Sequence, residues 1–257
     1  MKKFIHKFYK KYIRNKIKGT LARQRLKFFL WDVYGYIPLL KTNVVSFRKK
    51  LLLLKKFVLV DWYVVHAHKP CELVPVILLI LENANDSADA NAAVVEAGCW
   101  LGGSSAKLSQ ACAVSGRQLH IYDSFAGVEP GDPSNREAHF FGTYVGAEEI
   151  VRRNVERFGD MAVCTFHKGW FIESFKNYDM KTGIVYIDCD LTKATMEVIT
   201  AVQPHLLDGG KIFTQDYHIS SVREALHDTK TWEMLHILPP KIQKLERNTA
   251  SLNWDHV

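Results

Sequence analysis

Hydrophobic and polar positions alternate in a regular order from residue 91 onward. Short apolar runs occur at 93–97, 119–123, 162–167, 183–188 and 211–216. Between them, apolar residues recur at helical spacing in 104–114, 147–158 and 195–206. Short apolar runs are typical of buried strands, and a repeat of three or four residues is typical of amphipathic helices. The pattern therefore predicts βαβ units that build a mostly parallel sheet with helices on both faces.

Three shorter elements are expected after residue 216. The pattern predicts a helix at 221–228, followed by strands at 232–238 and 249–254. Two such strands form an antiparallel hairpin at the end of the sheet. Together with the five earlier strands they give seven, so we expect a Rossmann-like α/β fold with a seven-stranded sheet.

The first 90 residues predict helices and a loop. We expect a helix at 72–82, ended by the polar run 83–89. In 3–21 apolar residues fall on one helical face and lysines fill the other. We therefore expect a basic amphipathic helical extension over 1–60, followed by one α/β domain over 61–257 that carries the functional site.

Charge is distributed unevenly along the chain. The net charge of +7 comes from residues 1–30, which carry eleven Lys and Arg and no Asp or Glu, whereas the rest of the chain is net −4. A cationic amphipathic helix lies on an anionic membrane surface, or packs against its own domain or a partner, and the sequence leaves these alternatives open. An acidic body lacks the basic residues that phosphate contacts need, so no nucleic-acid partner is expected.

Cysteine usage and hydropathy bear on the compartment. The five cysteines form no CxxC pair, which argues against a disulfide framework and against a zinc site. No apolar run reaches the roughly 18 residues of a membrane span, and the N-terminus lacks the apolar core of a signal peptide. A cytoplasmic protein is expected, peripheral at the inner face of the membrane if residues 1–30 bind it. The oligomeric state, including a homo-oligomer, is left open.

Ligands of open parallel sheets bind at the carboxyl ends of the strands. After the first strand come Glu96, Gly98, Gly102 and Ser104, in a loop that leads into a helix. The glycines allow a tight turn and the helix start offers free N–H groups, but the spacing is not the dinucleotide GxGxxG. Alone, this loop is a weak signal.

The second and third strand ends add to that signal. Asp123, followed by Ser124, lies 25 residues after Gly98 and is placed to accept hydrogen bonds from two ribose hydroxyls, although a turn or N-cap aspartate is the alternative. Gly169 and Trp170 follow the third strand and would flank a flat base, unless Trp170 is a core residue. The combination indicates an adenosine-type cofactor.

The fourth and fifth strands end in oxygen-bearing side chains. Asp188 and Asp190 follow the fourth strand, and Gln215, Asp216 and His218 follow the fifth. Carboxylate and amide oxygens suit Mg²⁺, which would bind a substrate hydroxyl and lower its pKa. A carboxylate or His218 would then accept the proton. Asp190 has the alternative role of a cap for the following helix.

Taken in order, these segments resemble the macrocin O-methyltransferase (TylF/MycF) family. The resemblance covers roughly residues 60–230 and is carried by these stretches: 95–98 with 102–104, 122–127, 168–171, 186–191, and 208–210 with 215–217. It implies a class I methyltransferase sheet, S-adenosylmethionine (SAM) as methyl donor and usually Mg²⁺.

The resemblance also implies roles for individual residues. Glu96, Gly98 and Ser104 would line the SAM site, Asp123 would hold the ribose, and Asp188 and Asp216 would bind the metal, with Asp188 also a candidate base. Two positions depart from the family. Gln215 replaces an aspartate and should weaken Mg²⁺ binding, and Thr192 replaces a tyrosine, which should alter the acceptor pocket.

Three functions follow. The first is an O-methyltransferase that acts on a hydroxyl of a sugar or glycoside, including a glycan or glycolipid acceptor at a membrane. The second acts on a phenolic or polyketide hydroxyl, for which the aromatic residues of 31–63 would suit a flat acceptor. The third is a non-catalytic SAM-fold protein that binds a partner or membrane through residues 1–30.

Overall fold

The computed structural model describes residues 20–27, 32–82 and 92–254. Seven strands form one sheet in the order β3-β2-β1-β4-β5-β7-β6. The strands are β1 (Ala93–Ala97), β2 (Leu119–Asp123), β3 (Cys164–Lys168), β4 (Thr182–Ile187), β5 (Leu206–Thr214), β6 (Lys241–Lys244) and β7 (Ala250–Asn253). The first five are parallel, while β7 runs antiparallel to both β5 and β6. The predicted Rossmann-like class I methyltransferase sheet is confirmed.

The chain order reverses between β1 and β4. β1 pairs with β2 on one side and with β4 on the other. The loops that follow β1 and β4 therefore lead to opposite sides of the sheet. Such a switch point leaves a crevice at the carboxyl ends of the strands. The crevice is where the site residues of this chain are expected.

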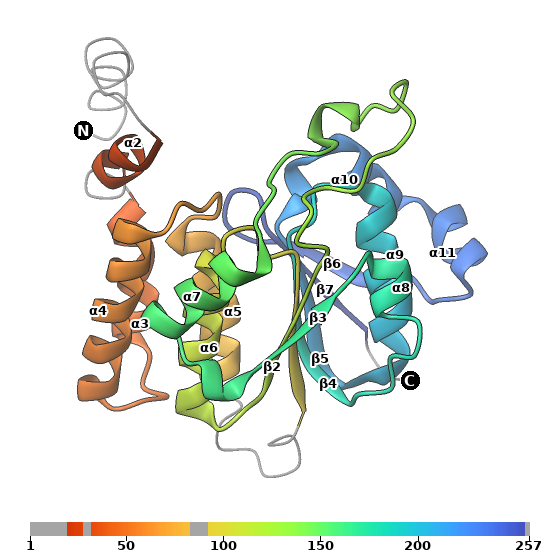
Figure 1. Ribbon diagram of the computed structural model, residues 1–257. Helices are drawn as coiled ribbons and strands as arrows, with labels where there is room; N and C mark the ends of the chain where they lie inside the picture. Colours follow the sequence, from red (N-terminus) through yellow and green to blue (C-terminus); the bar gives the residue numbers. More distant parts are fainter. Residues whose placement is uncertain (1–19, 28–31, 83–91, 255–257) are drawn as a thin grey trace, which may run out of the picture.

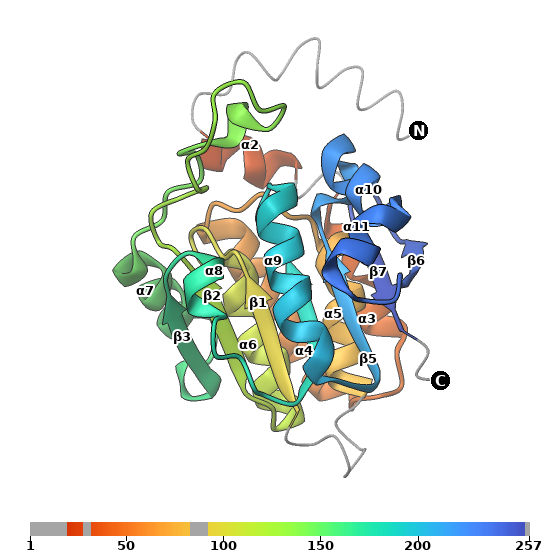
Figure 2. The ribbon, with the colours of Figure 1, turned by 90° about the vertical axis from the view of Figure 1, so that its right-hand side faces the viewer.

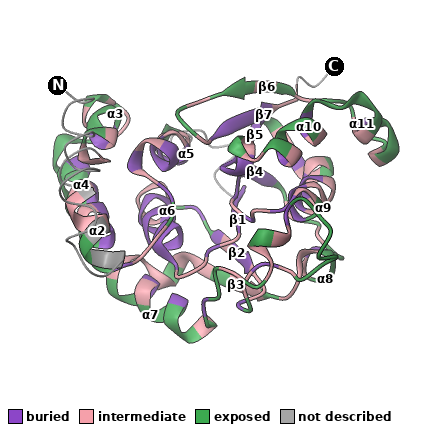
Figure 3. Ribbon diagram, turned by 90° about the horizontal axis from the view of Figure 1, so that it is seen from above, coloured by how far each residue is buried: buried purple, intermediate pink, exposed green. Residues whose placement is uncertain are grey.

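Helices cover both faces of the sheet (Figures 1 and 2). On one face lie α5 (Pro70–Glu82), α6 (Gly103–Ser115) and α7 (Glu148–Phe158), with α2 (Thr20–Lys27), α3 (Ile37–Lys41) and α4 (Phe47–Tyr63) outside them. On the other face lie α8 (Phe171–Ser174), α9 (Thr192–Val202), α10 (Ser220–His227) and α11 (Thr229–Leu235). Figure 3 shows α4 at the outer edge of the molecule, separated from the sheet by α5 and α6.

Successive strand residues point to opposite faces, and both faces are buried. Val94 and Ile184 pack against α5 and α6, whereas their neighbours Val95 and Val185 pack against the core of α9 and α10. A side-chain period of two with both faces covered produces the continuous apolar runs seen in the sequence. The two cores therefore fix the sheet and, with it, the ends of its strands.

The strand predicted at 232–238 is wrong, because this segment forms α11 and turns at its end. Asp228 begins the helix by accepting a hydrogen bond from the Lys230 amide at 3.2 Å. Trp232 is buried and its Nε1 donates to the Leu226 carbonyl at 3.0 Å. His236 then adopts a left-handed conformation with φ 55°, which ends the helix. The hairpin is real, but its first strand is β6.

Several expectations fall outside what the structure tests. The helix at 3–21 and the loop at 83–89 lie outside the described residues. A division at residue 60 falls within α4, and the two-part organisation stays a prediction.

Among the described helices, none is long and apolar enough to cross a membrane. All five cysteines are free.

Candidate active site

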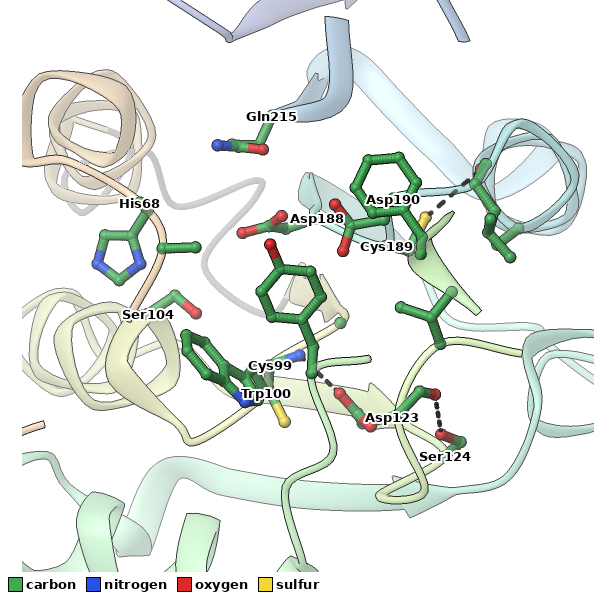
Figure 4. Close-up of a pocket in the computed structure, with 18 of the residues that line it drawn as sticks. His68, Cys99, Trp100, Ser104, Asp123, Ser124, Asp188, Cys189, Asp190 and Gln215 are labelled. Atoms are coloured by element: carbon green, nitrogen blue, oxygen red, sulfur yellow. Dashed lines mark hydrogen bonds between the residues drawn. The ribbon is translucent and has the colours of Figure 1, made fainter. Parts of the chain in front are cut away.

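A cavity of about 230 Å³ opens at the carboxyl ends of β1, β2, β4 and β5 (Figure 4). It brings together nine of the residues expected from the sequence: Gly98, Ser104, Asp123, Ser124, Gly169, Trp170, Asp188, Gln215 and His218. Three others, Glu96, Gly102 and Asp216, are buried and do not line it. Nine residues that follow the strand ends thus line one cavity, while the roles of individual residues depend on their contacts.

The turn after β1 is shaped by a close approach of two backbones. Gly98 has φ 88°, and a Cβ atom there would lie 1.9 Å from the carbonyl oxygen of Asp188. Only glycine accepts both conditions. The turn leads into α6, whose first residues include Ser104 on the cavity wall, so the unpaired N–H groups of the helix start face this region.

Asp123 lies on the floor of the cavity and is fixed by two backbone hydrogen bonds. Its Oδ2 accepts from the Cys99 amide at 2.7 Å and its Oδ1 from the Phe125 amide at 2.7 Å. Burial raises the pKa of Asp123, while these N–H groups act to lower it. Each carboxylate oxygen has a second lone pair, so the side chain keeps the capacity to accept hydroxyl hydrogens from a ligand.

Glu96 lies behind the cavity rather than on its wall. It is fully buried on β1, and burial raises its pKa to about 7, although the nearby hydroxyls of Ser104 and Ser105 act to lower it. Neither carboxylate oxygen of Glu96 has a hydrogen-bond partner among the described residues. A direct contact of Glu96 with a cofactor stays a prediction.

Asp188 and Asp190 point into the same part of the cavity, with the Gln215 amide above them (Figure 4). Burial, followed by the charges of Asp216 and Asp190, raises the pKa of Asp188 well above its usual value. Burial and Asp216 raise the pKa of Asp190 to about 8. Asp190 does not cap α9, whose N-cap position is occupied by Leu191. The sequence suggested the capping role, whereas the structure places Asp190 on the cavity wall.

Asp216 supports this acidic group from below. Its Oδ2 accepts hydrogen bonds from the amides of Cys189 and Asp190, at 2.8 and 3.0 Å. Its Oδ1 is buried and has no hydrogen-bond partner among the described residues. Asp216 thus holds the turn that presents Asp188 and Asp190.

Among the described residues, the wall of the cavity carries four carboxylates, from Asp123, Glu129, Asp188 and Asp190, and no Lys or Arg. The charges of Asp216 and Asp190 raise the pKa of Asp188, and the charge of Asp216 raises that of Asp190, so a cation bound there would relieve the repulsion. Asp188, Asp190 and Gln215 offer hard oxygen atoms of the kind that Mg²⁺ prefers. The residues present therefore fit a divalent cation.

A second buried polar group, missed by sequence reasoning, borders the cavity. Lys107 on α6 is fully buried, and its Nζ lies 2.5 Å from Asp61 Oδ1 and 3.1 Å from His68 Nε2. Tyr36 donates to Asp61 Oδ2 at 2.5 Å, and His66 Nε2 lies 2.8 Å from Asp61 Oδ1. His66 and His68 line the cavity. The loop between α4 and α5 is therefore held on the cavity wall by a buried ion pair.

The charges of this cluster are mutually compensated. Burial acts to raise the pKa of Asp61, but Lys107 and His66 outweigh it, so the pKa is lowered. Burial lowers the pKa of His68, and the Lys107 charge adds to the effect. Asp61, His66 and His68 lie close enough to share a metal ion, yet the Lys107 ammonium group already supplies the positive charge beside Asp61.

Aromatic side chains complete the cavity. Trp100 packs edge-on against Tyr144, with ring centroids 5.1 Å apart, and both line the wall. Trp170 also lines it, so it is not solely a core residue. Of residues 31–63, none of the described aromatics reaches the cavity. Thr192 does not line it either, because its backbone amide donates to the Glu137 carboxylate at 3.0 Å and its hydroxyl bonds the same group.

Comparison with known proteins identifies relatives of this chain. The model of the macrocin O-methyltransferase (TylF) family matches residues 80–247, which include β1 to β5. The 8-demethyl-8-(2,3-dimethoxy-alpha-L-rhamnosyl)-tetracenomycin-C 4'-O-methyltransferase of Streptomyces olivaceus is 32% identical over 148 residues, covering 52% of this chain and 56% of that protein. The mycinamicin III 3''-O-methyltransferase of Micromonospora griseorubida is 30% identical over 151 residues, covering 52% and 59%.

The chain thus spans little more than half the length of these curated relatives. Among solved structures, that of the O-methyltransferase NovP superposes with a TM-score of 0.62 at 19% identity, covering 74% of this chain and 84% of NovP. At this level of identity the superposition supports the fold alone.

Proposed function

The chain belongs to the macrocin O-methyltransferase family, and from this we propose that it transfers the methyl group of SAM to a hydroxyl group of a sugar or glycoside. The observation that carries the proposal is Asp123, held by the Cys99 amide at the floor of an acidic cavity beside the Gly98 turn. Asp123 would bind the ribose hydroxyls, and the helix start at Ser104 would face the amino-acid end of SAM. The acidic wall would favour the positively charged sulfonium group.

The reaction requires in-line geometry and a proton acceptor. The acceptor oxygen attacks the methyl carbon of SAM as the carbon–sulfur bond breaks, and the hydroxyl proton passes to a base. Asp188 is the first candidate base, because its raised pKa makes its carboxylate a stronger proton acceptor than an ordinary aspartate. His218, which also lines the cavity, is the second.

A divalent cation fits the same group of oxygens. We infer that Asp188, Asp190 and Gln215 would hold Mg²⁺, with Asp216 placing the turn. When bound, Mg²⁺ supplies a Lewis-acid contact that lowers the pKa of the acceptor hydroxyl. Because Gln215 is uncharged, we expect weaker binding of Mg²⁺ than with a third carboxylate at the wall.

The acceptor class rests on relatives and on the cavity. One relative methylates the 4' oxygen of a rhamnosyl-tetracenomycin, and another the 3'' oxygen of mycinamicin III, as their names state. The aromatic residues of 31–63, which would have suited a phenolic acceptor, do not line the cavity where they are described. A sugar or glycoside is therefore favoured over a phenolic or polyketide hydroxyl. A glycolipid acceptor would combine this chemistry with membrane contact by residues 1–30.

The first test is isothermal titration calorimetry with SAM and with S-adenosylhomocysteine. We expect binding by the wild type and its loss in Asp123→Ala, while Asp132→Ala, at an exposed aspartate outside the cavity, should bind normally. Repeating the titration with Mg²⁺ and a sugar acceptor tests whether Asp188, Asp190 and Gln215 bind the metal ion. No binding to the wild-type chain would favour the non-catalytic, partner-binding function.

A further inference from the structure

The outer face of α4 combines exposed apolar and basic side chains. Arg48, Leu52, Lys55, Leu59 and Trp62 follow one another at spacings of four and three residues and are all exposed. This spacing places them along one stripe of the helix. Beside the stripe, Phe47 and Leu51 are 65% and 45% exposed. A helix of a buried layer would not present large apolar side chains in such a row.

The charged groups on this face are all of one sign. Arg48, Lys49, Lys55 and Lys56 are exposed, and the single acidic residue of α4 is Asp61, which is buried against Lys107. The positive charge of the face is therefore not neutralised within the helix. A face that is both apolar and cationic matches an anionic lipid surface, where the basic groups meet lipid headgroups and the apolar groups enter the acyl boundary.

Among the described residues, the position of α4 leaves this face exposed. α4 lies at the outer edge of the molecule, beyond α5 and α6 (Figure 3). α2 contacts the end of α4, where Gln24 Nε2 donates to the carbonyls of Asp61 and Val64, both at 2.8 Å. Arg25 lies over the Trp62 ring, 5.0 Å from its centroid. Residues 1–19, which precede α2 in the sequence, carry eight further Lys and Arg.

We propose that the outer face of α4 docks on an anionic membrane surface. Nucleic acid would account for the basic groups but would leave Phe47, Leu51 and Leu52 without a partner, since phosphate contacts come from Lys and Arg. A second copy of the chain would cover the apolar groups but would bring two cationic faces together. The proposal concerns attachment and goes beyond methyl transfer.

Vesicle flotation tests the docking face directly. The full-length chain is mixed with vesicles of phosphatidylcholine alone or with roughly one third phosphatidylglycerol, and we expect about tenfold stronger binding to the anionic vesicles, weakened by salt. Arg48→Glu/Lys55→Glu should abolish this preference, and Leu51→Ser/Leu52→Ser should lower binding about fivefold. The matched control, Met234→Ser/Leu238→Ser, removes two more exposed apolar side chains, on the α11 side, and should bind within about twofold of wild type.

Three outcomes overturn the proposal. The first is that the wild type does not bind anionic vesicles. The second is that both α4 variants bind as the wild type does, which would assign any membrane contact to residues 1–30 alone. The third is that the α4 variants change only the molar mass measured by light scattering, which would make the face an interface between copies of the chain. Circular dichroism of every variant shows that each is folded, and SAM titration of the same variants keeps attachment separate from the proposed activity.

Discussion

Asp216 holds the backbone of Cys189, whose amide donates to Asp216 Oδ2 at 2.8 Å. The same oxygen accepts from the next amide, that of Asp190, at 3.0 Å. These bonds tie the end of β5 to the turn after β4, which carries Asp188 and Asp190 into the cavity. Asp216 therefore organises the acidic group from a position where it is itself buried.

The first prediction concerns this support. Asp216→Ala leaves two backbone N–H groups without their acceptor, and we expect the free energy of unfolding to fall by about 3 kcal/mol. Asp216→Asn retains an acceptor oxygen and should lose less than half of that. Urea unfolding followed by circular dichroism measures both.

Gln215→Ala is the control for Asp216, because Gln215 lines the cavity and its side chain makes no such contact with the turn. We expect it to leave the unfolding midpoint nearly unchanged while weakening any effect of Mg²⁺ on ligand binding. If Asp216→Ala were as stable as Gln215→Ala, the supporting role assigned to Asp216 would be wrong.

The second prediction concerns Gly98. In Gly98→Ala the new methyl group meets the Asp188 carbonyl oxygen at a residue with φ 88°, so a backbone shift is unavoidable. We expect a loss of more than about 3 kcal/mol in the free energy of unfolding, together with loss of SAM binding.

Gly116→Ala separates conformation from contact. Gly116 has φ 75°, but a Cβ atom there has nothing within 4 Å, so only the left-handed conformation is penalised, at about 1 kcal/mol. Equal destabilisation by the two substitutions, measured in the same urea titration, would show that the contact with Asp188 adds nothing.

The strand ends were predictable because parallel strands leave strong local signals. Asp123 and Asp188 each follow a short apolar run, and the sheet topology brings such ends to one edge. The edge itself could therefore be assigned from the sequence. Which of these side chains face the cavity could not be predicted from the sequence, because Asp216 and Asp188 each follow an apolar run in the same way and differ only in their tertiary contacts.

The other wall of the cavity had no such signal. His66 and His68 lie between two helices and reach the site because α6 passes close to them, as the 2.7 Å between a Cβ placed on Gly103 and His66 Cβ indicates. Lys107 sits on α6 among apolar and small residues, where an exposed position would be the default for a lysine. Its burial depends on Asp61, which is 46 residues away along the chain.

The third prediction follows from this pair. Lys107→Met leaves the Asp61 carboxylate buried without its cation, and we expect a loss of about 3–5 kcal/mol in the free energy of unfolding. Asp61→Asn should cost a comparable amount. The double variant should cost about 2 kcal/mol less than the sum of the two, because neither buried charge then remains unpaired.

Lys56→Met provides the comparison for this cycle, because Lys56 is exposed and its Nζ contacts the neutral Gln110 Oε1 at 2.7 Å. Combined with Asp61→Asn it should give additive effects. Additivity in the Lys107 cycle as well would mean that the buried contact contributes no coupling energy.

The last prediction is a pH dependence set by Glu96. Burial raises the pKa of Glu96 from 4.5 to about 7, so between these values the folded chain holds a proton that the unfolded chain has released. The contribution of Glu96 to the free energy of unfolding is therefore fully present below pH 4.5 and is lost as pH rises through about 7. The difference corresponds to about 3 kcal/mol.

In Glu96→Gln the side chain stays neutral at every pH and escapes this loss. Thermal unfolding of the two proteins should give similar midpoints near pH 4.5 and a higher midpoint for the variant at pH 8. A wild-type midpoint equal to that of Glu96→Gln at pH 8 would mean that the Glu96 carboxylate is solvated or paired there, and that burial does not impose the cost assigned to it.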